Sequence, residues 1–244
     1  MRIQDTVADK PGKLFDENVE ILMLGQIYPY ASRGGLKLEH ALEKFKINVE
    51  GKIALDIGSS TGGFTDCLLQ KGTAKVYAVD VGYGQLDWKL RKDERVICLD
   101  RTNARNLKRE DLSDDPQLVV VDVSFISLRL IFPTLFEILK QQGDLVALVK
   151  PQFEVGKDEI ENKGIIKDRV KRTNVLLRLH EFISEKSWVL RHITESPIQG
   201  QKGNREYLIH CTHTGFSLNQ EDIRIDVIFQ LILFNIVMLS CINL

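Results

Sequence analysis

From Gly51 onward, the sequence alternates between short apolar segments typical of buried β-strands and longer stretches with helical periodicity. Strands that alternate with helices form parallel sheets whose two faces are covered by those helices. The sequence therefore predicts an α/β fold with a mostly parallel, seven-stranded sheet. The predicted strands are Lys52–Ile57, Lys75–Asp80, Val96–Leu99, Leu118–Asp122, Leu145–Lys150, Trp188–Ile193 and Tyr207–His210. The predicted helices are Leu36–Phe45, Gly63–Gln70, Phe132–Lys140 and Val170–Glu185.

The composition is that of an ordinary globular protein. Of the 244 residues, 43% are hydrophobic and 27% are charged, which excludes a disordered or collagen-like chain. The formal net charge of −1 argues against a generally basic nucleic-acid-binding protein, although it allows a local basic patch. Two windows are locally basic: 163–191 has eight Lys/Arg against three Asp/Glu, and 87–109 has eight against four. A solvated helix face is the simpler interpretation of each window taken alone.

The cysteines and the two ends of the chain indicate in which cellular compartment the protein is expected. None of the four cysteines forms a CxxC pair or has a His at zinc-site spacing, so we expect buried, reduced thiols, no metal site and a cytoplasmic protein. The first residues contain no apolar signal-peptide region. Residues 227–244 form an 18-residue run without a charge. A membrane span needs about 20 apolar residues, so a buried closing segment or an aberrant tail is favoured over a membrane anchor.

A small-residue turn lies within residues 54–65, between a predicted strand that ends near Gly58 and a helix that begins near Gly63. Glycines in such a turn let the backbone approach a ligand closely, and ligands of open α/β sheets bind beyond the carboxyl ends of the strands. The spacing matches neither the dinucleotide fingerprint nor the P-loop. Asp80 and Asp100 end the next two predicted strands, where they can bind the ribose and the adenine side of a nucleoside cofactor. The alternative is a structural turn with two surface carboxylates.

Four charged residues lie where a catalytic centre is expected. Asp122 and Lys150 end otherwise apolar strands, where a charge is costly unless it is paired or used. Lys37 begins the helix that precedes the sheet, and Glu206 begins the last predicted strand. If the two lysines and two acids converge, like charge and desolvation would lower the pKa of one lysine while the carboxylates hold it in place. Unrelated ion pairs or surface charges are an equally good interpretation of the spacing alone.

Four motifs together resemble the hemolysin A (TlyA) family. They are the segments 30–38 (YASRGGLKL), 56–66 (DIGSSTGGFTD), 122–128 (DVSFISL) and 149–154 (VKPQFE), and the resemblance extends from about Asp9 to about His210. Members of this family are S-adenosylmethionine-dependent ribosomal RNA 2′-O-ribose methyltransferases with an FtsJ-like catalytic domain. The resemblance implies a Rossmann-like class I methyltransferase fold, with S-adenosylmethionine as cofactor and ribosomal RNA or ribosomal subunits as partner.

The resemblance also implies roles for particular residues. It implies a catalytic tetrad formed by Lys37, Asp122, Lys150 and Glu206. The predicted cofactor-binding residues are Asp56, Gly58, Ser59, Ser60, Thr61, Gly62, Gly63, Phe64, Asp80, Asp100 and Asp122. The predicted domains are a remnant of an S4-like RNA-binding domain (residues 1–25, read as a hairpin-like piece), an FtsJ-like methyltransferase domain (26–226) and an atypical apolar tail (227–244).

The hypothesis for the mechanism is direct in-line transfer of the sulfonium methyl group to a ribose 2′-oxygen. Because the cofactor carries an activated methyl group, the protein must mainly position the 2′-hydroxyl and assist its deprotonation. Lys150 would act as base or oxyanion stabiliser, Asp122 would orient it, and Lys37 with Glu206 would complete the electrostatic frame. Two rival functions remain: a membrane-active cytolysin, supported only by the apolar tail, and a non-catalytic RNA-binding protein that keeps the cofactor fold. The sequence selects neither the target nucleotide nor the oligomeric state, and we expect no stable membrane partner.

Overall fold

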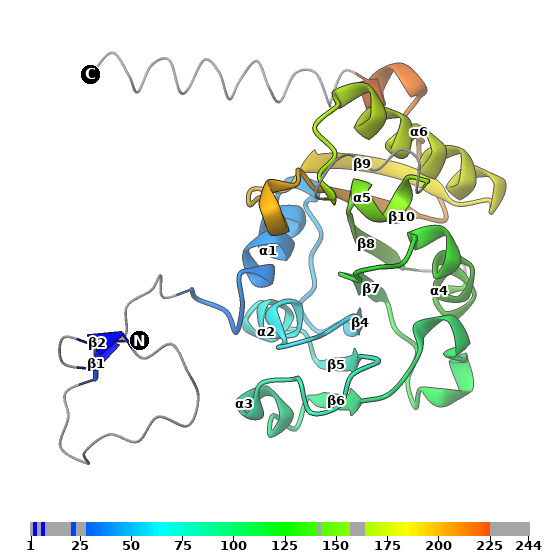
Figure 1. The fold of residues 1–244 in the computed structure, drawn as a ribbon. Coiled ribbons are helices and arrows are strands. Elements are labelled where there is room, and N and C mark those ends of the chain that lie inside the picture. Colours follow the sequence, from blue (N-terminus) through cyan, green and yellow to red (C-terminus); the bar gives the residue numbers. More distant parts are fainter. Residues whose placement is uncertain are drawn as a thin grey trace.

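The computed structural model describes residues 2–3, 6–7, 21–22, 28–140, 143–156 and 164–224. Seven strands form one sheet in the order β6-β5-β4-β7-β8-β10-β9, which crosses the centre of the molecule (Figure 1). Their bounds are β4 Ile53–Ile57, β5 Lys75–Val79, β6 Val96–Leu99, β7 Leu118–Val121, β8 Asp144–Val149, β9 Val189–Glu195 and β10 Tyr207–Thr212. All neighbouring pairs are parallel except those that β10 makes with β8 and β9. The predicted mostly parallel, seven-stranded sheet is thus confirmed.

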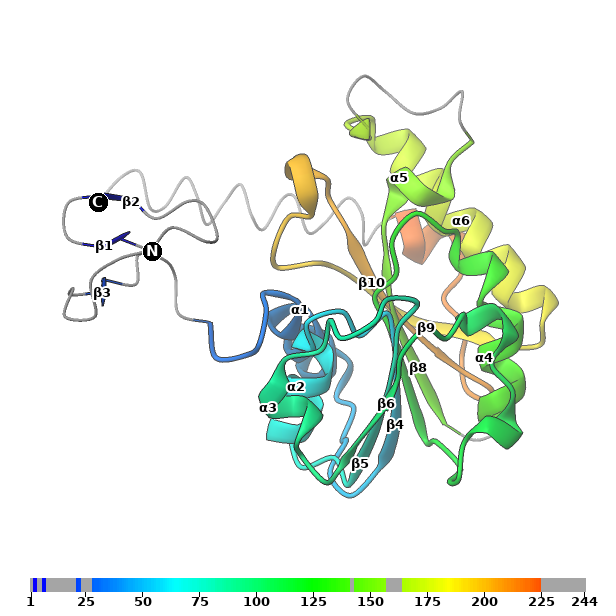
Figure 2. The same ribbon diagram turned by 60° about the horizontal axis from the view of Figure 1, so that its bottom comes forward.

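Helices cover both faces of this sheet, as Figure 2 shows from a second direction. One face carries α1 (Gly34–Phe45), α2 (Gly63–Gln70) and α3 (Trp88–Arg91), and the other carries α4 (Phe132–Leu139) and α6 (Arg169–Glu185). Two separate apolar clusters fill the two interfaces. The side chains of β7 illustrate how: Val120 packs into the cluster of α1 and α2, whereas Val119 and Val121 pack into the cluster of α4 and α6. This follows from the two-residue period of a strand, and it explains why a doubly covered strand is apolar throughout.

The predicted elements agree with the observed ones to within a few residues. Asp80, Asp122 and Lys150, which were expected to end strands, each lie one residue after the last strand residue. The helix predicted to continue to Lys140 ends at Leu139, because Lys140 has a positive φ of 54°. The four-residue helices α3 and α5 (Pro151–Glu154) were not predicted, since each is too short to display a helical period.

The antiparallel strand β10 determines which residues reach the ligand-binding edge of the sheet. Its first residue, Tyr207, lies opposite Val149 at the end of β8. The residues just outside these two positions, Glu206 and Lys150, therefore lie at the same edge. The proximity of Glu206 and Lys150 therefore depends on the register of the antiparallel pair β8–β10.

A polar cluster lies at the opposite edge of the sheet, at the start of β8. Asp144 accepts hydrogen bonds from Lys52 Nζ (2.9 Å) and pairs with His210 Nε2 (2.8 Å). The imidazole of His210 stacks on that of His192, with the two Nδ1 atoms 3.1 Å apart, and Phe45 at the end of α1 stacks on both rings. Burial alone would raise the pKa of Asp144, but the hydrogen bonds from its partners outweigh burial and hold the pKa at about 2.

The structure describes only part of the two chain ends that were predicted as separate domains. Three short strands, β1 (Arg2–Ile3), β2 (Thr6–Val7) and β3 (Ile21–Leu22), form an antiparallel sheet in the order β2-β1-β3. The remainder of the hairpin-like piece over 1–25 and the apolar tail over 227–244 lie outside the described residues, so the S4-like remnant and the role of the tail stay predictions. None of the helices within the described ranges has the length and apolarity that crossing a membrane requires.

Candidate active site

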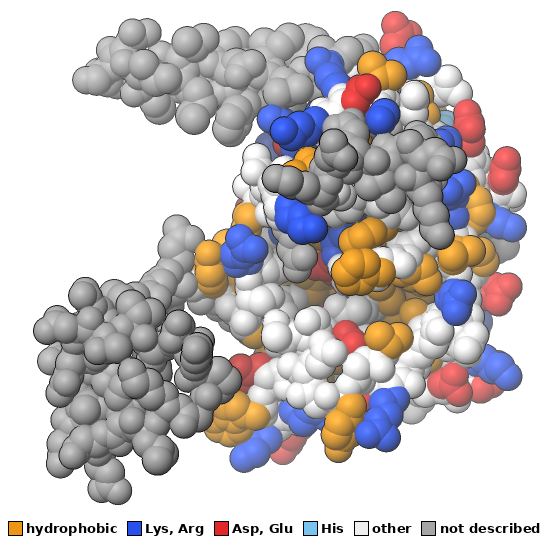
Figure 3. Space-filling view, in the orientation of Figure 1, with side chains coloured by type: hydrophobic (Ala, Val, Ile, Leu, Met, Phe, Trp, Pro, Cys, Tyr) orange, Lys and Arg blue, Asp and Glu red, His pale blue; other side chains and the backbone are white. Residues whose placement is uncertain are grey.

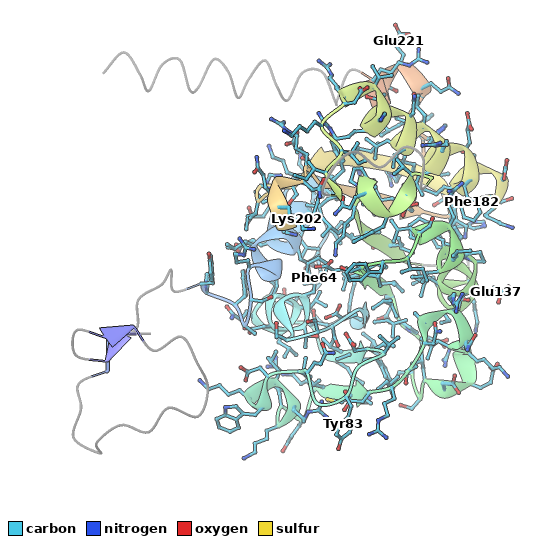
Figure 4. All side chains as sticks on the ribbon, viewed as in Figure 1. Phe64, Tyr83, Glu137, Phe182, Lys202 and Glu221 are labelled. Atoms are coloured by element: carbon cyan, nitrogen blue, oxygen red, sulfur yellow. The ribbon has the colours of Figure 1, made fainter. Side chains whose placement is uncertain are left out.

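Most of the predicted site residues line a cavity of about 350 Å³ at the carboxyl edge of the sheet. Five segments contribute its walls, within residues 32–37, 58–64, 122–125, 150–153 and 199–206. Figure 4 shows one wall residue, Phe64, near the centre of the molecule between α2 and the strands. These segments follow β4, β7 and β8, precede β10 and begin α1, so the cavity lies where open α/β sheets bind ligands.

The four predicted catalytic residues all line this cavity, and they form two lysine–carboxylate pairs. Lys37 Nζ donates to Glu206 Oε2 at 2.6 Å, with exposed side-chain fractions of 12% and 3%. Lys150 Nζ lies 2.7 Å from Asp122 Oδ1, and it also donates to Ser124 Oγ at 2.8 Å. The structure thus brings together the two lysines and two acids as expected, and each lysine has its own acid. Pairing offsets the cost of burying these charges.

The loop before β10 holds Glu206 in place. The carbonyl of Glu206 accepts a hydrogen bond from Ser196 N at 2.8 Å, and Gly200 N donates to the carbonyl of Asn204, also at 2.8 Å. A Cβ on Gly200 would overlap the Glu206 carboxylate. Glycine at this position therefore lets the loop pack directly against the Glu206 carboxylate without displacing it.

The small-residue turn after β4 forms a second wall. Gly58 has a φ of +81°, and a Cβ at this position would overlap the carbonyl oxygen of Asp122. Beyond it, Gly62 N donates to the carbonyl of Ser59 at 2.7 Å. Asp80 fastens the turn to the next strand, because its Oδ2 accepts from Ser60 N at 2.9 Å and its Oδ1 accepts from Gly82 N at 2.7 Å. The turn is therefore fixed in the shape that exposes backbone to the cavity.

Most of the predicted cofactor-binding residues lie on the cavity wall, but four do not. Those on the wall are Gly58, Ser59, Ser60, Thr61, Gly63, Phe64 and Asp122. Among the others, Asp80 accepts a hydrogen bond from the backbone of the turn at Ser60. A Cβ on Gly62 would collide with Leu86 and Leu90, and Asp100 forms an ion pair with Arg91 at 3.0 Å.

The fourth such residue, Asp56, is fully buried within β4. Its Oδ2 accepts a hydrogen bond from Thr65 Oγ1 of α2 at 2.6 Å. Burial raises the pKa of Asp56 to about 7, in spite of the bond from Thr65. In the structure this carboxyl joins β4 to the helix that begins at the turn.

Several wall residues were not predicted as site residues. The most prominent is Phe125, which is 87% exposed, has a φ of +65° and contacts Phe153 with ring centroids 5.0 Å apart. Ser32 and Arg33 line the opposite side at the start of α1. The sequence signal available for these residues was their position inside the motifs that carry Lys37, Asp122 and Lys150. The unpredicted wall residues are Ser32, Arg33, Gly34, Ser124, Phe125, Gln152, Phe153, Gln199 and Gly200.

Basic side chains gather on one side of this site. In Figure 3, blue side chains are concentrated at the upper left, over α1 and the η6 segment (Gln201–Gly203). Figure 4 labels Lys202 in this region. Tyr83, in the segment that follows β5, is labelled at the opposite, lower edge of the view. The cavity thus opens beside a positive surface in a protein whose total charge is −1.

Comparisons with known proteins agree with the fold. The FtsJ-like methyltransferase family matches residues 30–212. The Bacillus subtilis (strain 168) protein YqxC, named as a candidate rRNA methyltransferase, is 48% identical over 208 residues, which cover 85% of this chain and 74% of that protein. A 16S/23S rRNA (cytidine-2′-O)-methyltransferase, TlyA of Mycobacterium tuberculosis, is 42% identical over 210 residues, covering 86% and 78%. A solved structure from Streptococcus thermophilus, described as a candidate hemolysin, has a TM-score of 0.80 and 44% identity, and covers 90% of this chain and 80% of that one.

This chain belongs to the FtsJ-like methyltransferase family. Within that family, it groups with the TlyA and hemolysin A proteins. The resemblance carried by the four sequence motifs, the Rossmann-like fold, the methyltransferase class and S-adenosylmethionine as cofactor are thereby confirmed.

Proposed function

We propose that this protein transfers the methyl group of S-adenosylmethionine to a ribose 2′-oxygen of ribosomal RNA, with a cytidine as the target nucleoside. The observation that carries the proposal is the pair of lysine–carboxylate contacts, Lys37–Glu206 and Lys150–Asp122, on the wall of the same cavity as the small-residue turn. The cytidine 2′-oxygen is the target in the name of the Mycobacterium tuberculosis relative, which is 42% identical over most of this chain. Ribosomal RNA as substrate is consistent with action in the cytoplasm.

The residues of the turn fit a bound S-adenosylmethionine. Gly58, Ser59, Ser60, Thr61 and Gly63 all line the cavity, so a turn of small residues lets a ligand approach its backbone closely. The absence of a Cβ on Gly58 also lets this turn pack against the Asp122 carbonyl. Asp80 lies at the end of the neighbouring strand, and its carboxylate has acceptor capacity beyond the two N–H groups that it binds. We propose that the residues at 58–64 with Asp80 hold the cofactor. When bound, the cofactor supplies an electrophilic methyl group on a sulfonium.

The two lysines then act on the acceptor oxygen. Lys150 is held by Asp122 and Ser124, and because an ammonium carries three N–H donors, it can still bind an oxygen in the cavity. As the ammonium, Lys150 would stabilise the negative charge that develops on the 2′-oxygen. Only as the neutral amine, after losing one proton to solvent, would it take up the 2′-hydroxyl proton. Lys37, fixed by the nearly buried Glu206, adds a second positive charge to the same wall. The acids orient the lysines and offset their two charges, so that Arg33 is the unbalanced charge among the cavity-lining residues.

The exposed aromatic pair at the mouth of the cavity supports an RNA acceptor. Phe125 presents its ring to solvent against Phe153, and exposed aromatic rings of this kind stack on unpaired bases. The basic side chains over α1 and around Lys202 supply contacts for phosphates. An acceptor nucleotide bound here would place its base on the aromatic pair and its ribose next to Lys150.

The decisive experiment measures methyl transfer to ribosomal subunits. Purified protein is incubated with radiolabelled S-adenosylmethionine and with 30S or 50S subunits from a strain that lacks the enzyme, and ribose methylation is then mapped. We expect stoichiometric incorporation at cytidine 2′-oxygens. Absence of incorporation into either subunit would refute the proposal. RNA binding that is indifferent to the cofactor would then favour a non-catalytic RNA-binding protein, and lysis of red cells by a variant without Asp122 would favour a cytolysin.

A further inference from the structure

Glu154, the last residue of α5, is a buried acid that the mechanism above does not use. Its side chain is 6% exposed, and both carboxylate oxygens accept hydrogen bonds. Oε2 accepts from Ser127 Oγ at 2.6 Å, and Oε1 accepts from the backbone N–H of Leu128 at 2.7 Å. Both donors belong to the segment that follows β7, 26 or 27 positions earlier in the chain.

Burying a carboxylate at this position is costly. Burial raises the pKa of Glu154, although the bonds from Ser127 and Leu128 oppose this effect. An apolar side chain would fill the same space without that cost. The feature that an apolar side chain could not supply is the pair of directed hydrogen bonds, which fasten α5 to the segment after β7.

Helix α5 and the segment after β7 form one wall of the cavity. Three contacts join them, which we number from the edge of the sheet outward as the first, second and third levels. Lys150 contacts Asp122 and Ser124 at the edge of the sheet. Phe125 contacts Phe153 at the mouth. Glu154 forms the third level, beyond the aromatic pair, where Ser127 begins the short helix η3 (Leu128–Leu130).

The segment between the first and third levels is under backbone strain. Phe125 has a φ of +65°, a conformation that a side chain with a Cβ adopts only when its surroundings impose it. Asp122 holds the segment at one end, because its backbone N–H donates to Ile57 O at 2.9 Å. Glu154 holds it at the other end. Without that second attachment, Ser127 is held by its own turn, in which its carbonyl accepts from Leu130 N at 3.1 Å, and by the burial of Leu128 next to it. The opposition to relaxation of Phe125 toward a negative φ is then weaker.

We propose that Glu154 is a positioning residue for the acceptor wall: by fastening Ser127 and Leu128, it keeps Ser124 and Phe125 in the conformation that receives the RNA nucleotide. This inference rests on the proposed function, since the wall is an acceptor wall only if RNA is the substrate. Glu154 touches no reacting atom. Its removal should therefore impair use of the RNA substrate while leaving the cofactor turn, which belongs to other segments, intact.

The test compares Glu154→Ala and Glu154→Gln with a matched control, Glu137→Ala, on the exposed face of α4 (Figure 4). We expect Glu154→Ala to lower kcat/KM for the ribosomal subunit at least tenfold and to change the dissociation constant for S-adenosylmethionine less than twofold. Glu154→Gln should stay within threefold of the unsubstituted protein, because its amide oxygen still accepts from Leu128 N and its NH₂ can donate to Ser127 Oγ. Glu137→Ala should have no effect on either quantity.

Hydrogen exchange gives a readout that does not depend on turnover. In Glu154→Ala, faster amide exchange should be confined to the peptide that spans residues 122–131, with β4 and α2 unchanged. If Glu154→Ala fails to fold, Ser127→Ala removes one of the two hydrogen bonds, and it should show the same pattern with a smaller amplitude. Unchanged kinetics and exchange in Glu154→Ala, or in Ser127→Ala when the former is unfolded, would overturn the inference. Lack of methyl transfer by the unsubstituted protein would instead refute the proposed function, and the exchange experiment would still decide the role of Glu154.

Discussion

Replacing Lys150 with methionine tests the centre of the proposed mechanism. Methionine has a similar length and can occupy the same space, but it has neither the charge nor the N–H donors. Loss of general acid–base or charge-stabilising assistance costs about 10²- to 10⁴-fold in rate, or about 3–5 kcal/mol at 1.36 kcal/mol per tenfold. The substitution also leaves Asp122 without its cation. Because 22% of the Asp122 side chain is exposed to solvent, the destabilisation of the fold should stay near 1 kcal/mol.

The assay separates chemistry from binding. Enzyme in excess over ribosomal subunits is mixed with S-adenosylmethionine labelled on the methyl group, so that a single turnover is observed and product release does not contribute. Calorimetry gives the affinity for the cofactor, which should change less than threefold, since the turn at 58–64 is untouched. Lys140→Met, the same chemical change at an exposed position directly after α4 on the other face of the sheet, is the control, and it should match the unsubstituted protein in both measurements.

Arginine at position 150 distinguishes the two roles open to this lysine. A guanidinium keeps the positive charge, but its pKa is too high for it to accept a proton. If Lys150 acts as the base, Lys150→Arg should be as inactive as Lys150→Met; if it stabilises the oxyanion, Lys150→Arg should be at least tenfold faster than Lys150→Met. A Lys150→Met variant that transfers methyl groups within threefold of the normal single-turnover rate would refute the reasoning altogether.

Three further perturbations test the frame around this lysine. Gly58→Ala places a Cβ against the Asp122 carbonyl at a φ of +81°, so we expect about 1–2 kcal/mol of strain and at least a tenfold loss of cofactor affinity by calorimetry; normal affinity would contradict the role of the turn. Glu206→Gln removes the counter-charge of Lys37 but keeps the shape, so kcat/KM should fall at least tenfold with little change in Tm, and an unaffected rate would exclude this pair from the mechanism. The pKa of Asp144 is held at about 2, below its ordinary 3.8, so its contribution to stability is complete above pH 4 and is lost as the pH falls through 2. Urea unfolding should therefore show that Asp144→Asn lowers the free energy of unfolding by about 2 kcal/mol at pH 7 and by progressively less below pH 4. An equal loss at every pH would argue against the ionised pair.

The sheet was predictable from the sequence because its strands are buried on both faces. The central strands β7 and β8 are covered on both faces and appear as continuous apolar runs. The edge strand β9 is less regular, because Arg191 and His192 interrupt its apolar residues. The same reasoning located the ligand-binding edge, since a charged residue directly after such a run must lie at the end of a strand. Asp122 and Lys150 were found in this way, and the structure places them 2.7 Å apart.

The partner of each lysine could not be read from the sequence. Lys37 and Glu206 are separated by 169 positions, and they meet only because β10 runs antiparallel to β8 in a register that puts Tyr207 opposite Val149. Periodicity reports whether a residue lies on a strand, but it does not report the register of that strand against its neighbour. The resemblance to a known family supplied the four residues as a set, and the coordinates supplied the pairing.

The predicted cofactor acids show a related limit. Asp56, Asp80 and Asp100 look alike in sequence, as acids in or after apolar runs, but the structure gives each a different environment. Asp56 faces into the layer under α2 and binds Thr65, whereas Asp100 is neutralised by Arg91 from the four-residue helix α3. A helix that short has no periodic signature, so no pattern in the sequence could indicate that a cation would reach Asp100.

The two lysine–carboxylate pairs also explain why the total charge was a poor guide to the partner. A site that binds a polyanion and a cationic sulfonium cannot be uniformly positive, because like charge would oppose the cofactor, nor can it be uniformly negative, because it would repel the RNA. The pairs Lys37–Glu206 and Lys150–Asp122 meet both requirements, because each carboxylate offsets one ammonium and the lining keeps only the single positive charge of Arg33. Each ammonium still remains a local donor on the cavity wall. Because the charges in the pocket largely offset one another, the RNA phosphates are attracted instead by the basic side chains over α1 and around Lys202. A net charge of −1 is therefore compatible with an RNA substrate, provided that chemistry and docking are carried by different groups of residues.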